Sequence, residues 1–207
     1  MPNAAVQWSI GIRNEWDKMN FIDYKVKQEL IDFFRKQAEQ KIEVEGWGRQ
    51  GRNVEIKKEN FVHCWTTEEA FKQLLIEKKK WFRHRGLYFG DAVGAGADFT
   101  VRIEGKEVTM GLRSVASDSL ERWKSVAYPD DRFRDEKEKI ADYHLVCHHD
   151  DGATKFYGVI SKEELLRALE ISPRIFSRKN QEYFRVINIE KFNFEKMVEL
   201  MEKMERA

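Results

Sequence analysis

A single aspartate stands just before a predicted β-hairpin in the middle of the chain. Two segments of alternating apolar and polar residues follow Asp98, and residues 104–106 between them predict the hairpin turn. Residues two apart on a strand point the same way, so the returning strand presents four side chains on one face: Glu107, Thr109, Gly111 and Arg113. An aspartate with a second carboxylate and a cation can bind Mg²⁺ and activate water against a phosphate ester. Alternatively, Asp98 only caps a turn.

A second candidate is the cationic and aromatic run at residues 78–85. Lys and Arg suit phosphate contacts and a Trp ring suits base stacking, so six residues of the run predict a nucleic-acid interface: Lys78, Lys79, Lys80, Trp81, Arg83 and Arg85. Four nearby cations would enlarge it: Arg49, Arg52, Lys57 and Lys58. The alternative is the basic last turn of a helix, with Trp81 in the core.

A third set of residues has the types that bind zinc. Cys147, His148 and His149 are followed by two aspartates, and His63 precedes Cys64. No CxxC or HxxxH spacing is present, and a turn at residues 150–152 accounts for the polar residues without a metal. Glycine patterns of dinucleotide-binding, P-loop and nucleophile-elbow enzymes are also missing from the sequence.

The elements that must position these residues are predicted from periodicity and capping signals. Apolar residues at helical spacing predict a helix over residues 20–40, and a capping box at Thr66 and Glu69 predicts a second helix. Asp118 with Glu121 predicts a short helix after the hairpin. Further strands are expected at residues 143–147, 155–161 and 182–189, with helices beginning after Ser161 and Asn193.

This order predicts an α/β or α+β fold, in which a mixed central sheet is flanked by helices. Residues 1–60 are expected to form a helical N-terminal extension, and residues 61–207 the α/β core with its C-terminal strand and helix. The length of 207 residues suits one compact domain with an extension.

The composition favours a folded domain and excludes several other classes of protein. Hydrophobic residues make up 42% and aromatic residues 13%, which is ample material for a core, and the net charge of +1 excludes a polybasic protein. No stretch reaches the roughly 20 apolar residues of a membrane helix, and the first residues lack the pattern of a signal peptide. Two cysteines do not make a disulfide framework, so we expect thiols and a cytoplasmic location, with no membrane partner.

Residues 66–170 resemble the core of the PD-(D/E)xK nucleases, the restriction-endonuclease-like superfamily. In that family a helix precedes a hairpin whose first strand carries a metal-binding Asp and whose second strand carries E-x-K. The matching positions here are Glu68 or Glu69 on the helix, Asp98 on the first strand, and the stretch from Glu107 to Arg113 on the second.

The second strand departs from the family pattern. It offers Thr109-x-Gly111, or Gly111-x-Arg113 in a register shifted by two residues. The second carboxylate would then come from Glu107 or from Glu121 on the following helix. Arg113 would stand at the lysine position, where its charge suits a phosphate but its high pKa makes it a poor proton carrier.

The resemblance implies phosphodiester hydrolysis on nucleic acid, with DNA favoured over RNA, and Mg²⁺ or Mn²⁺ held by Asp98 and Glu107. It also implies catalytic roles for Glu69, Arg113 and Glu121, and a possible homodimer. Two alternatives stay open: a nucleic-acid-binding module of the same fold that has lost catalysis, and a protein-interaction module in which Asp98 is structural.

Overall fold

The computed structural model describes residues 20–46, 53–86, 97–115, 120, 122–150, 153–178 and 181–207. Its helices are α1 (Gln28–Glu45), α2 (Val54–Glu77), α4 (Asp130–Asp135), α5 (Lys162–Ile171) and α6 (Phe194–Lys203). Its strands are β1 (Ile22–Lys25), β2 (Phe82–His84), β3 (Phe99–Ile103), β4 (Lys106–Val115), β5 (Ser125–Pro129), β6 (Tyr143–Asp150), β7 (Ala153–Ser161), β8 (Arg174–Ser177) and β9 (Glu182–Asn188). The prediction of a mixed fold of helices and strands is confirmed.

The main sheet has the strand order β1-β7-β6-β4-β3-β2. Its strands pair antiparallel except for β4 and β6, which run parallel, so the sheet is mixed as expected. The β3–β4 hairpin turns at Glu104 and Gly105, both with positive φ, which is the geometry that matches the twist of a two-residue hairpin. A second sheet has the order β5-β9-β8.

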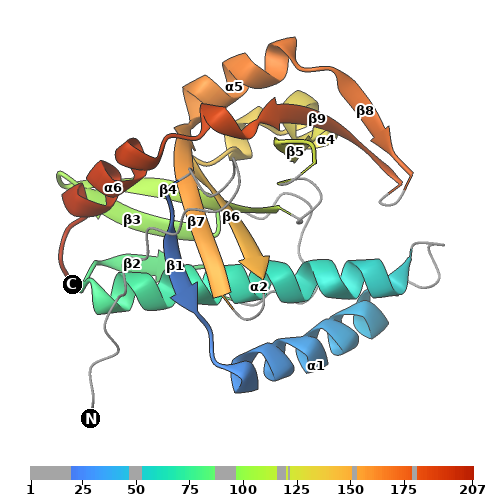
Figure 1. Cartoon of the computed structure of the whole chain (residues 1–207), viewed down its shortest axis with the longest axis horizontal. Helices are drawn as coiled ribbons and strands as arrows, with labels where there is room; N and C mark the ends of the chain where they lie inside the picture. Colours follow the sequence, from blue (N-terminus) through green and yellow to red (C-terminus); the bar gives the residue numbers. More distant parts are fainter. Residues whose placement is uncertain are drawn as a thin grey trace.

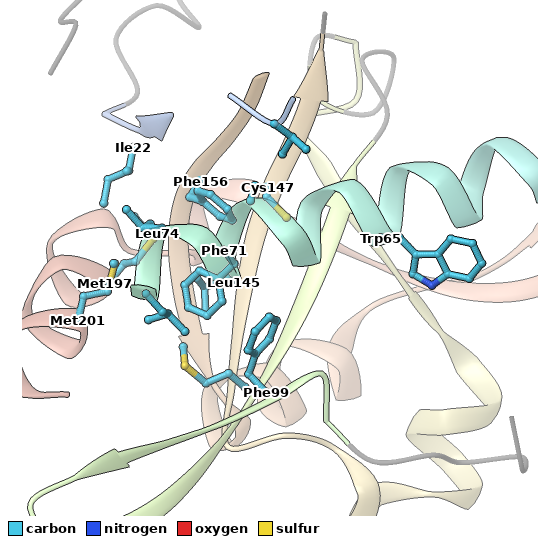
Figure 2. Packing of buried hydrophobic residues seen from close by; sticks show 14 of the residues in the cluster. Ile22, Trp65, Phe71, Leu74, Phe99, Leu145, Cys147, Phe156, Met197 and Met201 are labelled. Atoms are coloured by element: carbon cyan, nitrogen blue, oxygen red, sulfur yellow. The ribbon is translucent and has the colours of Figure 1, made fainter. Parts of the chain in front are cut away.

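Two apolar cores cover the two faces of the main sheet. On one side α2 and α1 run along the sheet, and on the other lie α5 and the second sheet (Figure 1). The first core packs Phe71 and Leu74 of α2 against Phe99, Leu145 and Phe156 of the strands (Figure 2). The second core contains residues of β5, β7, α5 and β9: Val126, Tyr128, Ile160, Leu165, Leu169 and Ile187. Each buried strand therefore carries apolar side chains on both faces, as sheets covered on both sides do.

Local signals set several helix ends. Ser161 and Glu164 form the expected capping box at the start of α5, and Asn193 caps α6 by accepting the Lys196 N–H at 2.7 Å. Asn53 caps α2 in the same way, and Gly46 ends α1 with a left-handed φ of 66°.

The N-terminal predictions need correction. Residues 22–25 form strand β1, which pairs with β7, and the first helix begins only at Gln28. The helix start predicted at Thr66 is wrong, because Thr66 and Thr67 are buried in the middle of one continuous helix, α2. The expected domain boundary at residue 60 falls within α2, and β1 belongs to the main sheet. The short helix expected after Asp118 lies outside the described residues.

Candidate functional site

A cavity of about 690 Å³ opens where α2, the start of β3, the middle of β4 and the region around α4 meet. Its wall includes Glu68 from α2, Asp98, and Gly111 and Arg113 from β4. His144 of β6 lies on the wall beside Gly111, its partner in the parallel pairing of β4 and β6. The cavity thus gathers residues from segments as far apart in the sequence as Lys41 and Glu182.

Asp98 is fixed by the backbone of the hairpin. Phe99 pairs with Met110, which places Asp98 beside Gly111 on the next rung. The Leu112 N–H donates to Asp98 Oδ2 at 2.7 Å, and a guanidinium nitrogen of Arg85 lies 3.6 Å from Oδ1. Asp98 therefore holds its carboxylate at the cavity wall in a defined orientation.

Glu68 is the helix carboxylate that reaches the cavity. It is 6% exposed, and its Oε2 lies 2.9 Å from His84 Nε2. Burial raises the pKa of Glu68; the hydrogen bond with His84 opposes this rise, and the negative charge of Asp98 adds to it. Two carboxylates that influence each other in a partly dry cavity form an arrangement that a cation would stabilise.

Glu69, the neighbouring candidate, faces another way. Lys72 donates to its Oε2 at 2.9 Å, and Gln73 donates to its Oε1 at 2.7 Å. Residues next to each other on a helix point about 100° apart, and of the two glutamates Glu68 lies on the cavity wall. The structure selects Glu68 for the helix position.

The structure separates Glu107 from Asp98. Glu107 pairs with Arg102 in the β3–β4 register, close to the hairpin turn, and is held by Arg83 at 3.1 Å and Arg102 at 3.7 Å. Four residues of strand separate it from Gly111, which is about 13 Å. The expectation that Glu107 shares a metal with Asp98 is therefore corrected. Glu121, the other expected second carboxylate, lies outside the described residues.

Arg113 brings a positive charge from β4 to the cavity. It follows Gly111 by two residues on β4 and lines the same cavity. Its guanidinium lies over the ring of Tyr128 at 4.4 Å from the centroid, which holds a positive charge in place through a cation–π contact.

The basic run at residues 78–85 is divided among different environments. It begins at Lys78, the C-cap of α2, and continues into the edge strand β2. Lys80 donates to the backbone carbonyls of Glu202 and Met204, and Trp81 stacks under the guanidinium of Arg102 at 3.9 Å. Arg83 pairs with Glu107, and Arg85 lies on the cavity wall.

The cations expected to enlarge that run lie elsewhere. Lys58 is 20 residues from Lys78 on the same helix, a distance of about 30 Å along its axis. It is bound to Glu39 at 2.8 Å. Arg49 and Arg52 lie outside the described residues. Lys78 and Lys79 end α2 at the opposite end from Lys58, so the described cations do not make one continuous patch.

The residues of zinc-binding type serve other contacts. Cys147 is buried in the first core, and β6 continues through Asp150 where a turn was expected. His148 Nδ1 lies 2.8 Å from the Val115 carbonyl, and His149 Nδ1 lies 3.2 Å from Thr154 Oγ1. His63 of α2 faces His149, with ring centroids 5.7 Å apart.

Within the part of the chain that the structure describes, no three His, Cys, Asp or Glu side chains gather as ligands of one metal ion. This arrangement does not suit zinc, which takes three or four protein ligands. Mg²⁺ is commonly held by one or two carboxylates, with water and substrate phosphate completing its shell. Glu68 and Asp98 supply two carboxylates, so the cavity wall fits Mg²⁺ or Mn²⁺.

Comparison with protein-family models, with curated proteins and with solved structures returned no match. Among the described residues, no helix is long and apolar enough to span a membrane.

Proposed function

We propose that this cavity binds a phosphodiester of nucleic acid, DNA in the first instance, and hydrolyses it with a divalent cation. One observation carries the proposal: Glu68, Asp98, Gly111 and Arg113 line one cavity. These are the helix, first-strand and second-strand positions of the PD-(D/E)xK arrangement, on a mixed sheet with a hairpin of the expected kind. The restriction-endonuclease-like fold is part of the same proposal.

Each residue has a role that follows from its contacts. Asp98, oriented by the Leu112 N–H, and Glu68, oriented by His84, would hold Mg²⁺. When bound, Mg²⁺ lowers the pKa of a water molecule and offsets charge on the phosphate. Arg113, supported by Tyr128, donates to a phosphate oxygen and stabilises the charge that develops during hydrolysis.

A second candidate function is binding without hydrolysis. Gly111 stands where the family carries its second carboxylate, and the described residues offer no other acid at that rung. A site with one carboxylate fewer can retain phosphate binding through Arg113 and lose cleavage. The two functions differ in a single measurable property, metal-dependent cleavage.

The test is a nicking assay on supercoiled plasmid and labelled oligonucleotides, with Mg²⁺ or Mn²⁺. The wild-type protein is expected to cleave, and Asp98→Asn and Glu68→Gln are each expected to reduce the rate at least about a hundredfold, since each removes a charge next to the reacting phosphate. Glu107→Gln is the matched control and should cleave at the wild-type rate, because Glu107 lies away from the cavity.

Each contrary result has a definite meaning. Cleavage by Asp98→Asn at the wild-type rate would place the active site elsewhere. No cleavage by the wild type, with nucleic acid still retained in a salt-dependent way that weakens in Arg113→Gln, would favour the second candidate.

A further inference from the structure

The ring of His144 occupies the space beside Gly111 where a larger residue would place its side chain. The two residues are partners in the β4–β6 register. A Cβ atom on Gly111 would lie 2.7 Å from His144 Nδ1 and 2.8 Å from His144 Cε1. Position 111 is therefore a glycine for a steric reason, and an imidazole from the neighbouring strand lies where the second carboxylate of the family pattern would be.

This imidazole is buried and its hydrogen-bonding capacity is unused within the chain. His144 is 2% exposed, and neither of its ring nitrogens has a hydrogen-bond partner among the residues that the structure describes. Buried polar atoms are nearly always paired, and those that are not frequently serve a ligand. Since His144 also lines the cavity, its ring nitrogens are available to a molecule bound there.

The charges that act on His144 are positive, although acidic residues such as Asp131 also line the cavity. Arg113 and Arg132 line the same cavity, and their positive charges act on His144 together with that of Lys162. Arg113 Nε is also buried without a hydrogen-bond partner in the described part of the chain. The Tyr128 ring carries the Arg113 guanidinium on its face and meets the His144 ring edge-on, with centroids 5.7 Å apart. Tyr128 thus holds both groups in place.

We propose that His144 and Arg113 form an oxyanion subsite that binds the non-bridging oxygens of a phosphate group. A neutral imidazole donates one hydrogen bond from its N–H, and the guanidinium donates from Nε and from its terminal nitrogens. The inference deepens the proposed function, because it names the residues that hold the phosphate while Glu68 and Asp98 face a cation.

The experiment uses inorganic phosphate, without metal, as the probe. Calorimetry compares wild type, His144→Asn and the control His149→Asn. His149 lies on β6 like His144, and its ring is hydrogen-bonded to Thr154 of β7. Phosphate is expected to bind the wild type and the control equally, and His144→Asn at least about tenfold more weakly. Equal binding by His144→Asn, or no binding by the wild type, would overturn the proposal.

A measurement on the wild type keeps the proposal testable if His144→Asn does not fold. Phosphate at saturation should shift the ring resonances of His144 in the NMR spectrum and leave those of His149 in place, and an unmoved His144 would overturn the subsite. Metal-dependent nicking that needs Asp98, with no phosphate effect on His144, would remove this subsite and leave the proposed function standing. Phosphate binding at His144 without nicking would support this subsite and contradict the proposed hydrolysis.

Discussion

At the scale of single residues, Gly111 and His144 depend on each other. Gly111→Ala must displace the buried His144 ring, and we expect it to lower the free energy of unfolding by about 1–3 kcal/mol, as overpacking does. In a His144→Ala background the same change should cost at least about 1 kcal/mol less, because the ring is no longer there. Urea unfolding of the two single variants and the double variant measures this coupling.

Gly158 provides the control for this cycle. Its Cβ would lie 2.8 Å from the backbone of Asn193 and 2.9 Å from that of Phe192, which His144→Ala does not move. Gly158→Ala and His144→Ala should therefore be additive. Additivity for Gly111→Ala and His144→Ala as well would contradict the steric account of position 111.

His144 also makes stability depend on pH. Burial, with the charges of Arg113, Arg132 and Lys162, lowers the pKa of His144 well below its ordinary value. The unfolded chain takes up a proton below about pH 6.5 that the folded protein does not, so the unfolding free energy should fall as pH falls below that value, by up to about 1.4 kcal/mol per pH unit for this residue.

Denaturant unfolding between neutral pH and about pH 5.5 checks this prediction. His144→Asn should flatten the dependence, leaving the part due to His63, whose pKa is also lowered by burial. An unchanged slope in His144→Asn would show that the imidazole takes up its proton over the same pH range in the folded and the unfolded chain, which contradicts a lowered pKa.

At the scale of elements, helices marked by caps of neighbouring residues were easier to predict than strands that depend on pairing with distant residues. The capping box at Ser161 and Glu164 and the cap at Asn193 predicted α5 and α6 correctly, because a cap is formed by residues three apart. Thr66 and Glu69 show the same spacing inside α2, where the helix began twelve residues earlier at Val54. Strand β1 was missed because its four residues are stabilised by pairing with β7, more than a hundred positions away.

One buried carboxylate joins the elements of the second sheet. Asp130 of α4 is fully buried and accepts from Arg174 of β8 and Arg185 of β9, both at 2.7 Å. Asp130→Asn should lower the free energy of unfolding by about 1–3 kcal/mol, since the amide keeps one acceptor oxygen but loses the other oxygen and the negative charge that Arg174 and Arg185 contact.

Thermal unfolding measures this loss, and Asp135→Asn is the matched control. Asp135 is an exposed acid at the end of the same helix, and its change should stay within about 0.5 kcal/mol of the wild type. Equal effects of the two changes would contradict the role given to Asp130.

At the scale of the whole molecule, the sequence predicted some of the residues that line the cavity and missed others. Asp98 and Arg113 were predicted and both line the cavity, because they lie on one hairpin whose register follows from its turn. For the helix residue, the sequence predicted either Glu68 or Glu69. It could not decide between them, because the side of α2 that faces the cavity depends on how the helix packs against the sheet. His144 was missed, because its closeness to Gly111 comes from a parallel pairing of strands distant in the sequence.

The central claim is that Glu68 and Asp98 together hold a divalent cation in this cavity. Its most direct test is a calorimetric titration of Mn²⁺ into the wild type, Asp98→Asn and Glu107→Gln. The account predicts one binding site in the wild type, its loss in Asp98→Asn and its retention in Glu107→Gln. Unchanged binding in Asp98→Asn, or loss of binding in Glu107→Gln, would contradict it.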